Sequence, residues 1–191
     1  MGQILKLTPP KNGEDTPSAA MAWLASIWQG QPTETYRRTL GLQEHISLEI
    51  VGTPERVFLQ TWAERPAAAY VVASHLKAHC PELAISQVDE ALAQPTACAS
   101  SELVLGLNRT RDLRVPRAQD ADPMAGILAS VACTAGDQWR MVQILVRPEL
   151  EPNLGSLAFQ TIIRLIACAD DPRHARNALG GMIATFGPFG G

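Results

Sequence analysis

The sequence predicts an α+β fold in which a mostly antiparallel sheet carries helices on one face. Segments that alternate apolar and polar residues predict half-buried strands, and segments that repeat apolar residues at helical spacing predict amphipathic helices. Prolines that follow a capping residue mark where helices begin. The predicted order is α, ββα, ββα, ββα, a ferredoxin-like succession of ββα units that forms either one domain or two subdomains.

Four helices are predicted from their first residues. The starts are Thr16-Pro17, Asp122-Pro123 and Asp171-Pro172, with a capping oxygen before the proline, and Arg65-Pro66, without one. Each start is followed by an apolar stripe that must be buried against another element. In chain order the stripes are Met21, Leu24 and Trp28; Ala69, Val72, Ala73, Leu76 and Cys80; Met124, Ile127, Leu128 and Val131; and Leu179, Met182, Ile183 and Phe186.

The segments between the helices are predicted as strands. In ISLEIVG the residues Ile46, Leu48 and Ile50 share one face, and the next strand comes after a short turn, so the two form a hairpin. QWRMVQILVRP is apolar on both faces in its middle, which is typical of a central strand. The predicted strands include 46–52, 56–62, 102–108, 138–148 and 157–169, and the middle ββα unit covers residues 84–134.

The chain is expected to divide into three parts. Residues 1–14 are expected to be a flexible N-terminus and residues 15–91 a first α+β unit. Residues 102–189 form a second unit, which in the alternative is continuous with the first. The stretch ALAQPTACASS, residues 91–101, is interpreted as a connector.

Composition excludes several classes of protein. The net charge of −3 argues against a chain whose main task is to wrap nucleic acid. No apolar run approaches the roughly 20 residues of a transmembrane helix, and the N-terminus lacks the apolar core of a signal peptide. The cysteines form no CxxC motif, so we expect reduced thiols and a cytoplasmic chain. They are Cys80, Cys98, Cys133 and Cys168.

Motifs of common enzymes are missing. The sequence contains no phosphate-binding GxxxxGK[ST] loop, no GxSxG, no HExxH and no GxGxxG. The carboxylates are scattered, with no pair that the sequence places in one cleft. We therefore predict that the chain itself is not an enzyme, with no catalytic residue and no bound cofactor.

One histidine pair is the candidate metal site. SHLKAHC places His75 and His79 four residues apart on a predicted helix, a spacing that can present two imidazoles to one zinc ion. His79 and Cys80 also border the apolar stripe, and no second ligand pair is visible, since His45 and His174 stand alone. We therefore expect no metal, and the pair is kept as the candidate for a metal or for an enzyme of unrecognised type.

A cluster of arginines is the candidate contact with nucleic acid or a protein partner. Guanidinium groups bind phosphates through two hydrogen bonds, so one loop-like stretch, NRTRDLRVPR, has the right chemistry. The alternative, which we favour, is a solvated loop balanced by neighbouring aspartates. The residues are Arg109, Arg111, Arg114 and Arg117.

An uncharged helix and a pair of glycines stand out near the C-terminus. PMAGILASVACTAG, residues 123–136, contains no charge, and a helix that is apolar all round is covered on several sides. We favour a core helix, with contact to a neighbouring subunit as the alternative. Gly180-Gly181 costs a helix about 1 kcal/mol per glycine relative to alanine, which indicates close packing or a helix that is incomplete by itself.

Three stretches together carry a resemblance. They are ISLEIVGTPERVFLQTW followed by HCPELAISQVDE, then DPMAGILASVACTAGDQWRMVQILVRP, then FQTIIRLIACADDPRHARNALGGMIATFGPF. In this order they resemble the region before the motor domain in ATPases of conjugation and type IV secretion, of the coupling-protein kind found in Gram-positive and related bacteria. Cys80-Pro81 stands where tyrosine-proline is usual, and only ELEPNLGS separates the last two strands. The matching positions are Asp122-Pro123, Gly136-Asp137, Gln143, Pro148, Phe159 and Arg164.

The resemblance implies a non-catalytic accessory domain. Its task would be assembly, through protein contacts with other subunits of a ring or of a secretion complex, including further copies of itself. The ATP site, magnesium and the DNA-translocating surface would lie beyond residue 191, so FGPFGG would join this part to the motor. The expected location is the cytoplasm, at the inner face of the membrane through partners. The alternative is a stand-alone α+β protein-binding module with no motor.

Overall fold

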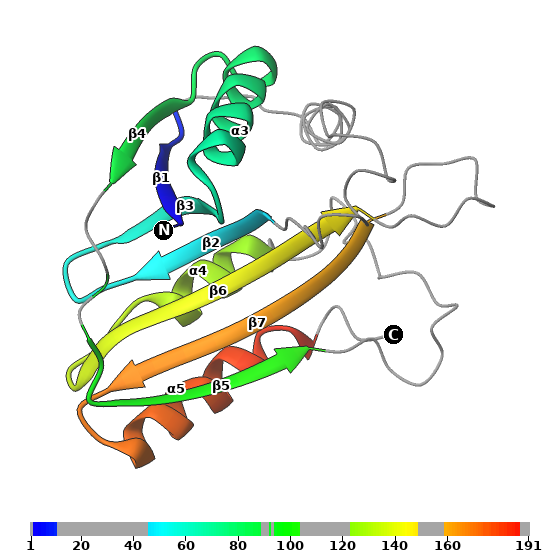
Figure 1. Cartoon of the computed structure of the whole chain (residues 1–191). Coiled ribbons are helices and arrows are strands. Elements are labelled where there is room, and N and C mark those ends of the chain that lie inside the picture. Colours follow the sequence, from blue (N-terminus) through cyan, green and yellow to red (C-terminus); the bar gives the residue numbers. More distant parts are fainter. Residues whose placement is uncertain are drawn as a thin grey trace. The chain divides into compact units, whose positions relative to one another are not determined.

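The computed structural model of the chain describes residues 2–10, 46–88, 92, 94–103, 123–148 and 159–187. Within them, seven strands form an antiparallel sheet in the order β4-β1-β3-β2-β6-β7-β5, and three helices pack against it (Figure 1). The predicted α+β class is therefore confirmed. The strands are β1 (Gln3–Thr8), β2 (Ile46–Gly52), β3 (Val57–Ala63), β4 (Ala84–Val88), β5 (Ala97–Leu103), β6 (Asp137–Pro148) and β7 (Phe159–Ala169), and the helices are α3 (Pro66–His79), α4 (Pro123–Val131) and α5 (Pro172–Ala184).

The chain folds into two compact units that interleave along the sequence. The first contains Met1–Leu48, Leu59–Glu90 and Leu145–Thr161. The second contains Glu49–Phe58, Ala91–Ile144 and Ile162–Gly191. Several long strands contribute residues to both units, so neither unit is one continuous stretch of sequence.

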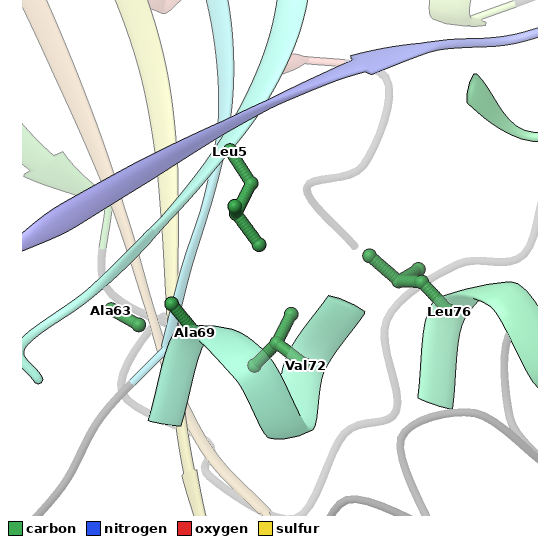
Figure 2. Close-up of a cluster of buried hydrophobic side chains, with 5 residues drawn as sticks. All are labelled: Leu5, Ala63, Ala69, Val72 and Leu76. Carbon is green, nitrogen blue, oxygen red and sulfur yellow. The ribbon is translucent and has the colours of Figure 1, made fainter. Parts of the chain in front are cut away.

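The core of the first unit lies between α3 and the strands of that unit. Ala69, Val72 and Leu76 succeed each other at helical spacing on the buried side of α3, as predicted, and meet Leu5 and Ala63 (Figure 2). The helix begins at Pro66 without a side-chain cap on Arg65, also as predicted. Its stability therefore depends mainly on the burial of this apolar stripe.

The expectation of a flexible N-terminus is wrong for residues 3–8. Gln3–Thr8 form β1, which pairs antiparallel with β3 on one side and with β4 on the other. Leu5 is buried in the core, opposite Thr61 of β3. QILKLT does alternate between an apolar and a mixed face, but the strand is too short for its two-residue period to stand out without its partner strands.

The core of the second unit lies beneath α4 and α5. Ile127 and Val131 of α4 are buried, as are Leu165 and Ala167 of β7. At Gly52 a side chain would collide with the backbone carbonyl of Val131, so this glycine permits α4 to approach β2 closely. The absence of a side chain at Gly52, the last residue of β2, is therefore required for the close packing of α4 on β2.

The buried face of α5 matches the predicted one only in part. Asp171 caps the helix by accepting hydrogen bonds from the N–H groups of Arg173 and His174, as the Asp-Pro signal predicts. Small residues, Ala175 and Ala178, join Met182 on the buried face, whereas Ile183 is 40% exposed. The predicted stripe is therefore right for Met182, which is buried, and wrong for Ile183.

Helix α4 is not the core helix that its composition favoured. Only Ile127 and Val131 of its apolar side chains are buried, whereas Met124 is 43% and Leu128 is 40% exposed. An uncharged helix is buried on all sides only if neighbours exist to cover it. Among the described residues, the side of α4 that carries Met124 and Leu128 is only partly covered.

The stretch interpreted as a connector contributes to a strand. Residues 97–101 belong to β5, which runs from Ala97 to Leu103 and pairs with β7. The strand predicted at 102–108 therefore starts five residues earlier, and residues 104–108 lie outside the described residues, as does the helix predicted at Pro17. ACASSEL consists mostly of small residues with little apolar contrast, so its sequence does not show the alternation typical of a strand.

No helix in the described ranges has both the length and the apolar character needed to span a membrane.

Candidate functional site

A polar cluster is centred on Asp137, at the start of β6. Its carboxylate accepts hydrogen bonds from the backbone N–H and the hydroxyl of Thr134 and lies 2.6 Å from Nη2 of Arg140. The other carboxylate oxygen lies 3.1 Å from Nε2 of His174. The Asp137 side chain is fully buried, so the turn after α4, the start of β6 and helix α5 are joined through one carboxylate.

The electrostatics of this cluster keep Asp137 ionised. Burial works against the charged form, but the hydrogen bonds from Thr134 and the neighbouring Arg140 outweigh it, so the pKa of Asp137 lies below its ordinary value. The side chain of Arg140 is 13% exposed, and its guanidinium also donates to the carbonyl of Ser130 at 2.9 Å. The pair is therefore a buried, hydrogen-bonded ion pair rather than a surface one.

The local sequence explains how this turn forms. Gly136 adopts a φ of 90°, a left-handed conformation that favours glycine, and the ring of His174 lies against the space where a side chain would be. The N–H of Asp137 donates to the carbonyl of Thr134, and the N–H of Asp170 donates to the carbonyl of Gly136. This turn therefore fixes both the carboxylate and the histidine beside it.

His174 is held by two aspartates. It hydrogen-bonds to Asp137 through its ring and to Asp171 through its backbone N–H. Cys133 lies nearby, but its thiol donates to the carbonyl of Gly52 at 3.2 Å. Burial and the charge of Asp137 raise the pKa of Cys133, which disfavours the reactive thiolate.

A second polar row crosses four neighbouring strands. Nε2 of Gln143 donates to the buried carboxylate of Glu49 at 2.8 Å, and Nη1 of Arg164 donates to the amide oxygen of Gln143 at 3.2 Å. Arg164 also donates twice to Glu102, at 2.7 and 3.1 Å. The row joins β2, β6, β7 and β5, and it provides the partner that a buried carboxylate requires.

The positions that carry the resemblance have roles in folding. Gly136 supplies the left-handed turn, Asp137 the buried carboxylate, and Gln143 and Arg164 two links of the polar row. Of the other matching positions, Asp122 lies outside the described residues. In the sequence His174 stands alone, but in the structure its ring pairs with the carboxylate of Asp137. The Thr134–Asp137 turn is a local pattern that sequence could reveal, but the approach of His174 depends on the packing of α5.

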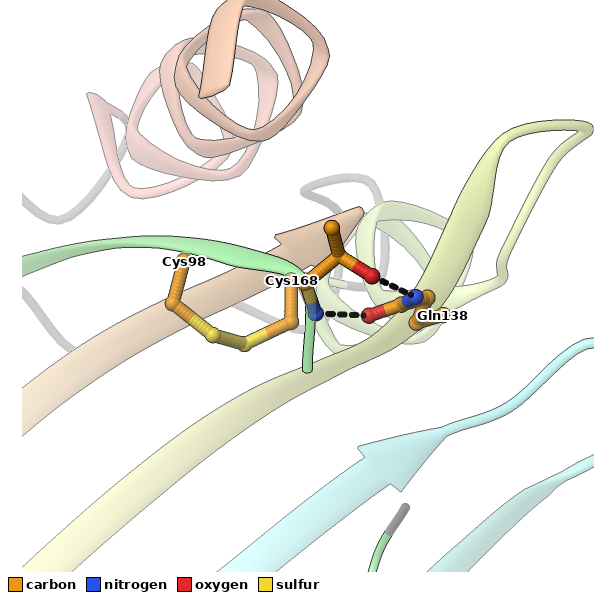
Figure 3. Close-up of a disulfide and its surroundings, with 4 residues drawn as sticks. Cys98, Gln138 and Cys168 are labelled. Atoms are coloured by element: carbon orange, nitrogen blue, oxygen red, sulfur yellow. Dashed lines mark hydrogen bonds between the residues drawn. A yellow bond between two sulfur atoms is a disulfide. The ribbon is translucent and has the colours of Figure 1, made fainter. Parts of the chain in front are cut away.

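Two cysteines expected to be reduced form a disulfide. Cys98 of β5 and Cys168 of β7 are paired directly across the two strands, with Cα atoms 4.2 Å apart (Figure 3). Beside the disulfide, Gln138 exchanges hydrogen bonds with the backbone and side chain of Thr96 (Figure 3). The two cysteines are 70 residues apart and belong to no motif, so only the strand pairing reveals the bond. Cys80 and Cys133 take no part in a disulfide.

The exposed side of α4 is the candidate interaction surface, here called the α4 surface. It consists of Met124, Ala125, Gly126, Leu128 and Ala129. None of these residues carries a charge, and the two large ones are both exposed by 40% or more. Uncharged apolar surface that is shaped by a rigid helix is typical of contacts with another protein.

The described residues provide no support for the candidate metal site, and the arginine candidates lie outside them. His75 and His79 are half-buried on α3, and the part of the chain that the structure describes contains no group of three or more ligating residues that could hold a metal ion. Arg109, Arg111, Arg114 and Arg117 all lie outside the described residues.

Comparison of the chain with family models, with curated proteins and with solved structures finds no match.

Proposed function

We propose that this chain is a non-catalytic assembly domain of a DNA- or protein-transfer ATPase, of the kind that serves conjugation or type IV secretion. Its partners would be neighbouring subunits of a ring or of a secretion complex at the cytoplasmic face of the membrane. The observation that carries the assembly role is the α4 surface. The resemblance of residues 45–189 to the region before such motors suggests the type of complex.

The α4 surface suits a permanent protein contact. Fully burying a Met or Leu side chain is worth about 1.5–3 kcal/mol, so covering the exposed parts of Met124 and Leu128 contributes about 1 kcal/mol each. The small residues between them allow a partner to approach the helix backbone. No charge on this surface has to be desolvated when a partner binds, which lowers the cost of association.

A non-catalytic role agrees with the chemistry of the described residues. The Asp137 cluster has its hydrogen bonds directed inward, and Cys133 is held as a thiol. In this proposal ATP hydrolysis belongs to a motor domain elsewhere in the parent protein, and the cofactors of that motor do not bind here.

A charge on the α4 surface tests the proposal. Leu128→Lys should lower the frequency of DNA or protein transfer in the source cells by at least about tenfold, since about 1.4 kcal/mol corresponds to a tenfold change in affinity. Tyr70→Lys, at a 76% exposed position of α3, is the matched control and should leave transfer unchanged. Immunoblots must show equal amounts of both variants. Normal transfer in cells that lack the chain altogether would contradict the proposal, and so would ATP hydrolysis by the purified chain.

The second candidate is a stand-alone α+β module that binds a peptide along a sheet edge. β4 favours it, because this strand lies at one edge of the sheet and contains no charged residue and no proline. An immunoblot of source cells separates the two candidates. A band several times heavier than 20.6 kDa supports the motor-associated domain, and a band at that mass supports the separate module.

A further inference from the structure

The other edge of the sheet is formed by β5. This strand pairs with β7 along its whole length, from Ala97 opposite Ala169 to Leu103 opposite Ile163, with consecutive residues always opposite consecutive residues. It is the last strand in the sheet order, so no described strand lies on its other side. Figure 1 shows β5 at this edge, next to β7, and α5 packs against it.

The pairing geometry identifies which backbone groups point outward. Residues that exchange hydrogen bonds across an antiparallel pair have Cα atoms about 5.5 Å apart, and the alternate pairs about 4.5 Å. The Cα atoms of Cys98 and Cys168 are 4.2 Å apart, so this is a pair without mutual hydrogen bonds. The N–H and C=O groups of Cys98, Ser100 and Glu102 therefore point away from β7, toward the side on which no described strand lies.

This edge lacks the usual protection against pairing. Natural edge strands carry lysines, prolines or bulges that prevent another strand from adding. β5 contains no lysine, no proline and no bulge. Its one charged side chain, Glu102, is neutralised by Arg164, which donates to it at 2.7 and 3.1 Å.

The edge is also fixed in position. The Cys98–Cys168 disulfide ties β5 to β7 at one end, and the Arg164–Glu102 ion pair ties it at the other. Most of its side chains are small, namely alanine, cysteine and serine. A strand that is held in register and has little side-chain bulk needs little ordering when another strand is added.

We propose that two copies of this chain associate by antiparallel pairing of β5 with β5 of the second copy, giving a sheet that continues through both molecules. The two-fold axis lies at Ser100. Ser100 then faces Ser100 of the second copy, and Cys98 faces Glu102 of the second copy on either side. All outward N–H and C=O groups of the three residues are satisfied in this one register.

The sequence of β5 favours a second copy over an unrelated peptide as the occupant. The strand is its own complement, because the symmetric register places uncharged residues opposite each other at the centre and keeps the two Glu102 carboxylates apart. Each carboxylate also brings its own Arg164 counter-charge. Self-complementary surfaces of this kind form two-fold dimers. The proposal does not depend on the transfer-ATPase assignment, and its surface differs from the α4 surface.

Sedimentation equilibrium of the full chain, with its disulfide intact, tests the proposal. The expected result is a dimer that dissociates in roughly the micromolar range. Ser100→Pro removes the N–H that points outward while sparing the hydrogen bonds to β7. It should weaken the dimer by at least about tenfold, because each copy loses one hydrogen bond to the other. Ser100→Ala keeps the N–H and should dimerise like the wild type.

Two further measurements keep the test decisive. Ser100→Lys places two positive charges opposite each other at an exposed position and should also weaken the dimer, whether or not the proline variant folds. Amide exchange should show protection of Ser100 only at high protein concentration, and protection of Ala99 and Ser101 at every concentration. A wild-type chain that stays monomeric overturns the proposal, even if an added peptide binds the edge. A dimer that survives both Ser100 changes but is dissociated by Leu128→Lys also overturns it.

Discussion

Asp137 offers the sharpest test of how the second unit is held together. Asp137→Asn keeps the shape of the side chain but removes its charge. It leaves Arg140, whose side chain is only 13% exposed, without this counter-charge. Breaking a buried ion pair by removing one partner costs about 3–5 kcal/mol. The amide oxygen still accepts one hydrogen bond from Thr134, so we expect the lower end, about 3 kcal/mol.

The matched control is the half-exposed ion pair of the same chemistry. Glu102→Gln also removes a carboxylate from an arginine, but the Glu102 side chain is 49% and the Arg164 side chain 38% exposed. Solvent screens such a pair, and its loss should cost less than about 1 kcal/mol. For a chain of this size 1 kcal/mol corresponds to about 2–4 °C in melting temperature, so the expected falls are about 6–12 °C for Asp137→Asn and under about 4 °C for the control.

The pH dependence provides an independent check. The pKa of folded Asp137 lies below its ordinary value, so its contribution to stability is fully present above an ordinary aspartate pKa of about 3.9 and is lost as the pH falls through the folded pKa. The difference in unfolding free energy between wild type and Asp137→Asn should stay constant above about pH 5 and shrink below about pH 4. Equal losses for Asp137→Asn and Glu102→Gln, or a difference that grows in acid, would refute the buried ion pair.

The remaining predictions concern close packing, the disulfide and a helix cap. Gly52→Ala should destabilise the chain by about 3 kcal/mol or more, because the new methyl group meets the backbone of α4. Gly126→Ala, with open space around it, should stabilise the helix by about 0.5–1 kcal/mol. Equal effects of the two variants in denaturant titrations would contradict the packing at Gly52. Reduction of Cys98–Cys168 should cost about 2–4 kcal/mol, and a double serine variant should melt at the same temperature with and without reductant. Asp171→Ala should lower the melting temperature and Asp171→Ser should restore most of it, a pattern that a mere surface charge would not produce.

The sequence allowed the helices and the long strands to be predicted because their signals are local. Asp171-Pro172 caps α5, and the stripe of Val72 and Leu76 buries α3. The same local signals orient α5 only in part, since Met182 is buried as predicted but Ile183 is exposed, and the small Ala175 and Ala178 are buried as well. Which side of a helix becomes buried depends on the space beneath it, and here that space takes two alanines and one methionine.

The parts that sequence missed depend on strand pairing. β1 and β5 are short and lack strong apolar contrast, and each becomes a strand through its neighbours, β1 through β3 and β4, β5 through β7. The Cys98–Cys168 disulfide results from that pairing, and the Asp137–His174 contact from the packing of α5 beside the start of β6. Sequence separations of 70 and 37 residues leave no local trace of either contact.

The residues that carry the resemblance differ in role from the residues of the α4 surface. Gly136, Asp137, Gln143 and Arg164 have folding roles that any chain with this turn and this polar row would need. Such residues favour a shared fold more strongly than a shared activity. On the α4 surface, by contrast, Leu128 is 40% exposed rather than packed in the core. The transfer-ATPase proposal therefore depends on Leu128 and its neighbours, and a variant of this surface is more informative about function than any change in the matching motif.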